Sequence, residues 1–315
     1  MKRVLITGSN GLLGQKLAEL LLCGSDYDLM LTSVESSSII EGDDIQYRQL
    51  DITNRSDVRR VVDDFHPDVI VNTAAITNVD QCETERQLAW NVNVIGVENL
   101  VIAAKFVGAK VIQFSTDYIF DGKAGPYDEE ARPNPMSYYG RTKLASENVL
   151  RTHEIPFAII RTMVLYGVAP MVKLNFALWL VHELERGKPV RVVDDQYGNP
   201  TLADDLAYGV LKIIVLDRRG VYNIAGADYV SRYEFALALA KQFGIDKKLI
   251  TPIKTAILKQ PAPRPMRSGF IILKAETDLG IKMSGVEHGL TVIKNQLSLI
   301  GKKSGEPAAS PQKQH

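Results

Sequence analysis

A tyrosine and a lysine four positions apart, Tyr139 and Lys143, are the residues best suited to catalysis in this sequence. On a helix, side chains at i and i+4 lie on the same face, so the phenol and the ammonium group can point into one cleft. A hydroxyl residue, Thr116, ends an apolar run further upstream and is followed by Asp117. A phenol beside a cation is a candidate proton donor, because positive charge favours the phenolate form. The sequence therefore suggests acid–base chemistry by Thr116, Tyr139 and Lys143.

A tyrosine and a lysine at this spacing also occur by chance, so the pair needs support from elsewhere in the chain. That support is a glycine-rich turn near the N-terminus, between the apolar run 4–6 and a set of helically spaced leucines. Glycines there permit a tight turn, close approach to a pyrophosphate and packing of the helix on the sheet, while the helix N-terminus attracts phosphates. An ordinary strand–helix loop is the alternative. The residues expected to contact a dinucleotide are Gly8, Asn10, Gly11, Leu12, Leu13 and Gly14.

An acidic residue, Glu35, follows the second predicted strand, 29–33, where a carboxylate would accept hydrogen bonds from the adenosine ribose. No Arg or Lys occurs between Lys16 and Arg48, so a 2′-phosphate lacks an obvious cation nearby. The sequence therefore favours NADH, with NADPH left open. A solvated loop carboxylate is the alternative role for Glu35.

Two more strand ends are expected to contact the cofactor. Asp51 and Ile52 follow residues 46–50, and a carboxylate at this edge can accept from an adenine amino group. Ala74 and Ala75 follow the apolar strand 68–72, and such small residues let a planar cofactor lie against the backbone. Asp51 or Thr53 could instead cap the helix predicted at 54–65, and the two roles are compatible.

A nicotinamide at the sheet edge would give the catalytic candidates a reaction. Hydride transfer to a ketone leaves charge on its oxygen, which Tyr139 would protonate if Lys143 lowers the pKa of the phenol from about 10. Thr116 would donate to the same oxygen and hold its orientation. Lys143 would also donate to the cofactor ribose, so Tyr139 and Lys143 are expected to contact the cofactor as well.

Strands and helices alternate through the first half of the chain, which predicts an α/β fold with a Rossmann-type, doubly wound parallel sheet. Residues 1–165 are expected to form this dinucleotide-binding domain, including a long helix at 84–107 and the catalytic helix at 137–152. The shorter, interrupted elements of residues 166–301 predict a smaller C-terminal substrate-binding subdomain, with some crossing of the chain between the two. Residues 302–315 are predicted to be a disordered tail.

Composition excludes several classes of function. The 315 residues are 45% hydrophobic, and 37 basic residues balance 37 acidic ones, which argues against nucleic acid or a membrane as partner. The five histidines are scattered and the two cysteines form no metal motif, so no metal is expected. Two unpaired cysteines and the short N-terminal apolar run suggest a cytoplasmic protein. A homodimer is considered, although the sequence does not decide the oligomeric state.

Several segments together resemble the dTDP-4-dehydrorhamnose reductase family of the extended short-chain dehydrogenase/reductase superfamily. The most specific are STDYIFDG at 115–122 and DQYGNPT at 195–201, and the resemblance runs to about residue 300. It implies reduction of the 4-keto group of a nucleotide-linked 6-deoxy sugar, with Thr116, Tyr139 and Lys143 catalytic and Thr116 and Asp117 beside the sugar. Arg264, flanked by prolines, could pair with the diphosphate of the substrate, and a surface arginine is the alternative. The segments that carry the resemblance are 7–14, 72–75, 115–122, 139–147, 161–162 with 166–167, 195–201, and Arg264-Pro265 with Ser268.

Two positions depart from the family pattern. The family usually continues Arg161-Thr162 with Ser-Trp, whereas this chain has Met163 and Val164, so Val164 stands where a sugar-facing tryptophan is expected. Arg232 likewise replaces a usual tryptophan after Ser231. The identity of the sugar is therefore open. A nucleotide-sugar epimerase and a cofactor-binding regulatory subunit are the alternatives; the first lacks a second acid or base, and the second has no need of all three catalytic candidates.

Overall fold

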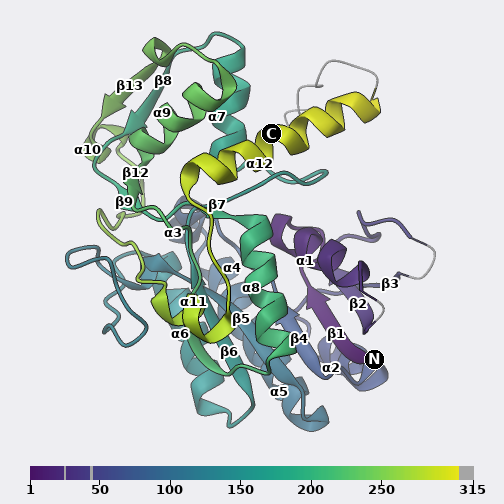
Figure 1. Ribbon diagram of the computed structural model, residues 1–315. Helices are drawn as coiled ribbons and strands as arrows, with labels where there is room; N and C mark the ends of the chain where they lie inside the picture. Colours follow the sequence, from purple (N-terminus) through teal and green to yellow (C-terminus); the bar gives the residue numbers. More distant parts are fainter. Residues whose placement is uncertain (25, 43–44, 305–315) are drawn as a thin grey trace.

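Seven parallel strands form the central sheet of the computed structural model, which describes residues 1–24, 26–42 and 45–304, the last four by their backbone alone. The strand order is β11-β6-β5-β4-β1-β2-β3 (Figure 1). This is the predicted doubly wound sheet, and the fold prediction is confirmed. In chain order the strands are β1 (Lys2–Thr7), β2 (Tyr27–Ser33), β3 (Gln46–Gln49), β4 (Val69–Asn72), β5 (Lys110–Thr116), β6 (Phe157–Thr162) and β11 (Gly220–Asn223).

Successive side chains of β1 enter two separate cores, because neighbouring residues of a strand face opposite sides of the sheet. Val4 and Ile6 belong to the core on one face, and Leu5 belongs to the core on the other. A strand buried on both faces reads as a continuous apolar run, as it does here. The first face is covered by α1 (Leu12–Leu22), α8 (Ala203–Val215) and α11 (Leu273–Leu279), and the second by α2 (Arg55–Phe65), α5 (Gly96–Val107) and α6 (Tyr138–Thr152).

A smaller lobe with its own core lies beyond one edge of the sheet, at the top of Figure 1. Its helix α9 begins after Ser231, whose hydroxyl accepts from the Glu234 N–H while the Glu234 carboxylate accepts from the Ser231 N–H. This capping box fixes the helix start. The lobe contains α7 (Phe176–Glu185), α9 (Arg232–Phe243), α10 (Thr255–Leu258) and α12 (Val286–Ser304), with the strand pairs β8 (Val190–Val193) and β13 (Ile250–Ile253), β9 (Tyr197–Gly198) and β12 (Val230–Ser231), and β7 (Leu165–Tyr166) and β10 (Thr201–Leu202).

The chain returns from this lobe to the sheet. Helix α8 packs on α1, and β11 adds to β6 as an edge strand with Val221 opposite Ile159. Side chains of α11, together with Ile281 and Met283, complete the same core. These segments cross from the smaller lobe back to the sheet. The division of the chain into domains at 1–165 and 166–301 stays a prediction.

One predicted helix and the predicted tail have different bounds in the structure. The helix expected at 84–107 is interrupted, because Glu85 has non-helical backbone angles and a π-helical turn spans Asn91–Ile95. Three helices replace it: α3 (Val79–Thr84), α4 (Arg86–Trp90) and α5. The last helix continues to Ser304, so residues 302–304 of the predicted tail are helical, and the rest of that prediction lies outside the described residues.

Candidate active site

Parallel pairing brings the strand ends that carry the predicted site residues to one edge of the sheet. Thr7 at the end of β1 lies opposite Asn72 of β4, and Thr116 of β5 lies opposite Thr162 of β6. The Thr7 hydroxyl donates to Asn72 Oδ1 at 2.6 Å, which ties the first two strand ends together. The segments after these ends therefore meet at the carboxyl edge, where open α/β sheets bind ligands.

The three catalytic candidates lie together at this edge. Tyr139 and Lys143 are on successive turns of α6, and both side chains are buried. The Thr116 hydroxyl is near enough to the Tyr139 phenol to lower its pKa, and it donates to Asp117 Oδ1 at 3.0 Å. The T-shaped packing of Tyr118 on Tyr139, with ring centroids 5.6 Å apart, holds the phenol against the strand end. The three residues that the sequence predicts to act together are therefore clustered in the structure.

Burial sets the protonation of this cluster. Desolvation raises the pKa of Tyr139 above its usual range and the Asp117 carboxylate adds to the rise, while the Thr116 hydroxyl opposes it. The pKa of Tyr139 is thus raised and not lowered, so the expected lowering by Lys143 is not seen. Desolvation lowers the pKa of Lys143 itself to about 8, against the attraction of Glu147. Tyr139 therefore carries its proton at neutral pH, as a proton donor must.

Both carboxylate oxygens of Asp117, the residue after Thr116, accept hydrogen bonds. Thr116 Oγ1 donates to Oδ1, and Ser268 Oγ donates to Oδ2 at 2.5 Å. Burial raises the pKa of Asp117 to about 6, and the two hydroxyl donors hold it from rising further. Ser268 comes from the C-terminal loop, so this contact joins the smaller lobe to the end of β5.

The glycine turn is shaped for close approach of a phosphate. Gly8 has φ +68°, and a Cβ there would lie 2.6 Å from the Ala74 nitrogen. A Cβ on Gly14 would lie 2.6 Å from the Gly8 oxygen, so α1 can approach the turn only with glycine at that position. Gly11 is the N-cap of α1 and supplies no side-chain cap, so the first N–H groups of the helix, including those of Leu12 and Leu13, have no partner within the helix. These features fit a dinucleotide pyrophosphate.

Asn10 and Glu35 are brought together after β2. Asn10 Nδ2 donates to Glu35 Oε2 at 3.3 Å and to the Ser37 carbonyl at 3.0 Å, so Asn10 orders the loop in addition to any cofactor contact. Ser33 Oγ donates to the same Glu35 oxygen at 2.5 Å and is the first cause of a lowered pKa for that carboxyl. Glu35 is exposed and ionised at the position expected for ribose recognition.

The other cofactor candidates lie along the same edge. Asp51 Oδ1 accepts from the N–H and hydroxyl of Thr53, which orders the turn, and the N-cap of α2 is Asn54. The Ile52 side chain is buried beneath Gly96 of α5. Ala74 and Ala75 are partly buried beside the glycine turn. Their contacts with a cofactor stay predictions.

The substrate candidate Val164 has an unusual backbone. Its φ is +47°, which is costly for a β-branched residue, and the Thr201 N–H donates to its carbonyl at 3.1 Å. Met163 is buried and packs against Gly198, where a Cβ would lie 2.2 Å from the Met163 methyl carbon. Val164 and Met163 line a narrow pocket next to Asp117, and neither offers an aromatic face.

Arg264 is committed to a protein partner. Its NH1 donates to Asp80 Oδ1 at 2.8 Å and its NH2 to Asp80 Oδ2 at 2.7 Å, and NH1 also donates to the Ala262 carbonyl. The guanidinium fork that a diphosphate would need is therefore occupied by Asp80. The pair links α3 to the C-terminal loop. Diphosphate binding by Arg264 would require this pair to open.

Two positioning elements were missed by sequence reasoning. Asn93, in the π-helical turn, accepts from the Ile76 N–H at 2.9 Å and donates to the Ile76 carbonyl and to Thr142 Oγ1 of the catalytic helix. In the sequence, a polar asparagine among the apolar residues of a predicted helix was the signal that could have indicated this role. Further along α6, the fully buried carboxylate of Glu147 pairs with Arg161 of β6 through two hydrogen bonds of 3.0 Å. Both fix the helix that carries Tyr139 and Lys143.

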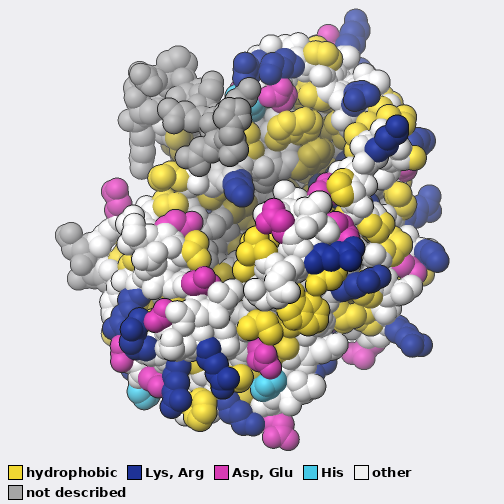
Figure 2. All heavy atoms as spheres, turned by 180° about the vertical axis from the view of Figure 1, so that it is seen from behind, with side chains coloured by type: hydrophobic (Ala, Val, Ile, Leu, Met, Phe, Trp, Pro, Cys, Tyr) yellow, Lys and Arg dark blue, Asp and Glu magenta, His cyan; other side chains and the backbone are white. Residues whose placement is uncertain are grey.

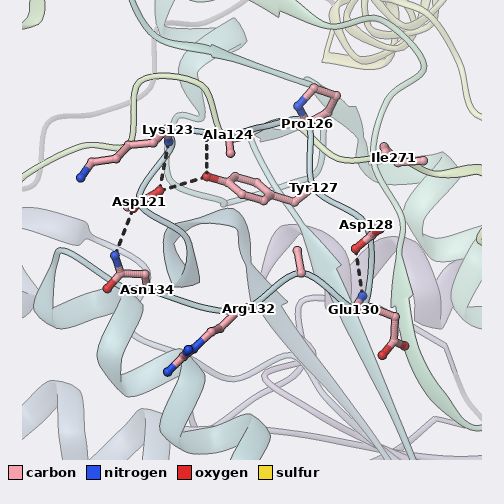
Figure 3. A pocket seen from close by; sticks show the side chains of 11 residues that line it. Asp121, Lys123, Ala124, Pro126, Tyr127, Asp128, Glu130, Arg132, Asn134 and Ile271 are labelled. Carbon is pink, nitrogen blue, oxygen red and sulfur yellow. Dashed lines mark hydrogen bonds between the residues drawn. The ribbon is translucent and has the colours of Figure 1, made fainter.

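A hollow of about 620 Å³ lies away from this cluster (Figure 3). It is formed by the loop between η2 (Asp117–Ile119) and α6, where Asp121 accepts hydrogen bonds from Tyr127 and Asn134. None of Thr116, Tyr139 and Lys143 lines it. Size alone therefore does not identify the reactive site.

The surface and the remaining ionisable groups offer few other sites. Lys and Arg side chains are interspersed with Asp and Glu on the face in Figure 2, which is hollowed between the two lobes. Within the described parts of the chain, no three His, Cys, Asp or Glu residues are placed to hold a metal ion. None of the described helices combines the length and hydrophobicity needed to cross a bilayer.

Comparison with known proteins gives consistent matches over nearly the whole chain. The family model described as "RmlD substrate binding domain" matches residues 1–298. A dTDP-4-dehydrorhamnose reductase of Aggregatibacter actinomycetemcomitans is 34% identical over 306 residues, covering 93% of this chain and 99% of the relative. A crystal structure of a dTDP-4-dehydrorhamnose reductase from Clostridium acetobutylicum is 35% identical with a TM-score of 0.85, over 94% of this chain and 99% of that one. The Bacillus anthracis reductase, solved in complex with NADP, is 33% identical with a TM-score of 0.85, over 94% of this chain and all of its own.

Proposed function

The chain belongs to the RmlD substrate binding domain family, the dTDP-4-dehydrorhamnose reductases of the extended short-chain dehydrogenase/reductase superfamily, and we propose that it reduces the 4-keto group of a nucleotide-linked 6-deoxy sugar. The observation that carries the proposal is the burial of Thr116, Tyr139 and Lys143 together at the carboxyl edge of the sheet, with Tyr139 and Lys143 one turn apart on α6. These groups lie beside a glycine turn that fits a dinucleotide.

The proposed mechanism assigns one task to each residue. When bound, the nicotinamide cofactor supplies a hydride to the carbonyl carbon. Tyr139 donates its proton to the carbonyl oxygen, and Thr116 orients that oxygen by donating a hydrogen bond. Lys143 donates to the cofactor ribose and so ties the position of the cofactor to that of Tyr139. The remaining cofactor contacts are proposed as Gly8, Asn10, Gly11, Leu12, Leu13, Gly14, Glu35, Asp51, Ile52, Ala74 and Ala75.

A substrate screen tests the function directly. Nucleotide-linked 4-keto-6-deoxy sugars are mixed with the protein and NADH or NADPH, and cofactor oxidation is followed at the nicotinamide absorbance. Oxidation with at least one of them is the expected result. Clear cofactor binding without oxidation of any of them would favour a regulatory subunit, and interconversion of two sugars without net oxidation would favour an epimerase.

Glu35 is proposed to set the cofactor preference toward NADH. An ionised carboxylate at the adenosine ribose repels a 2′-phosphate, and a unit-charge interaction near a protein surface amounts to about 1–4 kcal/mol. Glu35→Gln is expected to improve NADPH affinity relative to NADH by about tenfold, or about 1.4 kcal/mol. Fluorescence titration with both cofactors measures this ratio. The exposed Glu41→Gln variant is the control, and an unchanged ratio in Glu35→Gln would remove Glu35 from the ribose site.

Lys143 makes the proposed cofactor contact dependent on pH. Its pKa of about 8 means that the charged form predominates below pH 8 and is lost as pH rises through 8. The affinity of the free enzyme for NADH should therefore fall between about pH 7 and pH 9. In Lys143→Ala, affinity and turnover should both be weak and this fall should vanish. A wild-type affinity that stays constant from pH 7 to 9 would contradict the ribose contact.

The proposal also covers the binding partner of the protein, its location in the cell and its assembly. A nucleotide sugar is the proposed partner, and mixed surface charge on the face in Figure 2 fits a chain that does not bind nucleic acid. Cys23 and Cys82 are both free thiols, which fits a reducing, cytoplasmic compartment. A homodimer is the proposed assembly, to be checked by light scattering of the purified protein.

A further inference from the structure

Arg232 places a positive charge inside the pocket that adjoins the catalytic cluster. It is the first residue of α9, and its backbone N–H donates to the Gln196 carbonyl at 3.0 Å. The guanidinium lies over the Phe176 ring, 5.0 Å from the centroid, and lines the pocket together with Asp117 and Tyr118. The helix start and the stacked ring thus hold the guanidinium in one place.

The guanidinium is not neutralised by the protein. Among the described residues it donates no hydrogen bond, and no carboxylate oxygen lies within the 4.0 Å of an ion pair. The Asp117 carboxylate attracts it electrostatically, but its oxygens already accept from Thr116 and Ser268. Burial lowers the pKa of Arg232, which indicates that water solvates the charge poorly. A partly buried cation with five unused donors is costly unless a ligand accepts from it.

The charges around Arg232 indicate that such a ligand is negatively charged. Another arginine, Arg264, repels Arg232 and is itself neutralised by Asp80. The N-terminus of α9 adds partial positive charge on the same side of Arg232. An acceptor group with two oxygens in one plane would match the guanidinium fork.

We propose that Arg232 is a specificity-determining residue that binds an oxyanion of the substrate through its guanidinium group. The inference rests on the proposed reductase function, because it takes the pocket beside Tyr139 as the sugar site. Two parts of a nucleotide sugar carry this chemistry: the diphosphate, and a carboxylate on the sugar in place of the methyl group of a 6-deoxy sugar. Either would explain an arginine at a position where the family resemblance predicts a tryptophan.

Binding measurements separate the two sources without requiring turnover. Calorimetric titrations use the full chain saturated with NADH and three ligands: dTDP, dTDP-glucose and dTDP-glucuronate. If the diphosphate is bound, Arg232→Gln should weaken all three by about 10- to 100-fold, the range for a hydrogen bond to a charged group. If a carboxylate is bound, only dTDP-glucuronate should weaken by that factor. Arg232→Lys should give a smaller loss, because it keeps the charge without the fork.

Arg267→Gln is the matched control, since Arg267 is an exposed arginine that also stacks on an aromatic ring, that of Tyr197, and does not line the pocket. Its affinities should equal those of the wild type. Affinities of Arg232→Gln and Arg232→Lys within threefold of the wild type for all three ligands would overturn the inference, and so would absence of binding of all three to the wild type at millimolar concentration. Failure of the reductase proposal looks different, because the wild type would then oxidise no cofactor with any 4-keto sugar whatever the effect of Arg232 on binding.

Discussion

Tyr139→Phe should lower the rate of ketone reduction by about 10²- to 10⁴-fold, the contribution typical of a positioned general acid. The substitution removes only the phenolic oxygen, so the packing of the ring against Tyr118 is preserved. Burial and Asp117 keep this phenol protonated in the resting enzyme, and the Thr116 hydroxyl cannot replace it as the acid, because an alcohol is a far weaker acid than a phenol. Single-turnover oxidation of NADH with a substrate found by the screen measures the effect.

The loss should be confined to the chemical step. The affinity of Tyr139→Phe for NADH should stay within a few-fold of the wild type, since the proposed ribose contact belongs to Lys143. Tyr138→Phe is the matched control, because Tyr138 is the preceding residue of the same helix and its ring lies beneath the Arg86 guanidinium, outside the cluster. Turnover of Tyr139→Phe close to that of Tyr138→Phe would refute Tyr139 as the proton donor.

Glu147→Ala should destabilise the protein by about 3–5 kcal/mol, the cost of leaving a buried charge without its partner. Arg161 is only 2% exposed, and its other guanidinium contacts, the donation to the Glu129 carbonyl and the Phe120 ring 5.5 Å away, do not neutralise its charge. Burial would raise the pKa of Glu147, but the hydrogen bonds and charge of Arg161 hold it below its usual range, so the pair is ionised at neutral pH. Urea unfolding followed by circular dichroism measures the loss.

Two further variants separate charge from packing. Glu19→Ala removes an exposed carboxylate from α1 and should change stability by no more than about 0.5 kcal/mol. The double variant Glu147→Leu with Arg161→Met replaces the buried pair by apolar groups and should recover most of the stability, because neither charge is then left unpaired. A loss below about 1 kcal/mol in Glu147→Ala would mean that solvent reaches the pair in solution.

Local pattern was enough to predict the sheet and the elements that carry Thr116, Tyr139 and Lys143. The apolar run before Gly8, the glycine spacing and the pair Tyr139 and Lys143 each depend on neighbours within a few residues, and each lies where it was expected. The parallel sheet then brings Thr116 beside Tyr139, a consequence of topology that alternation of strands and helices already implies.

Contacts between distant segments could not be predicted in this way. Nothing near Arg264 in sequence signals that Asp80 will occupy its guanidinium, and nothing near Lys143 signals that burial will outweigh its charge. The interrupted helix at Glu85 and the burial of Glu147 against Arg161 likewise depend on segments that meet only after folding. The partner of a side chain and its desolvation depend on the tertiary structure, so they cannot be inferred from a single sequence.

The return of β11 and α8 to the sheet limits how the active site can open. Several connections join the lobes, among them the one from β6 into β7, the one from β10 into α8, and the one from β11 to β12. A rigid rotation of the smaller lobe would have to bend all of these connections together and break the contact between Ser268 and Asp117. Substrate entry should therefore proceed by local rearrangement of the loop around Arg264, where one ion pair must open, and not by a hinge motion about a single linker.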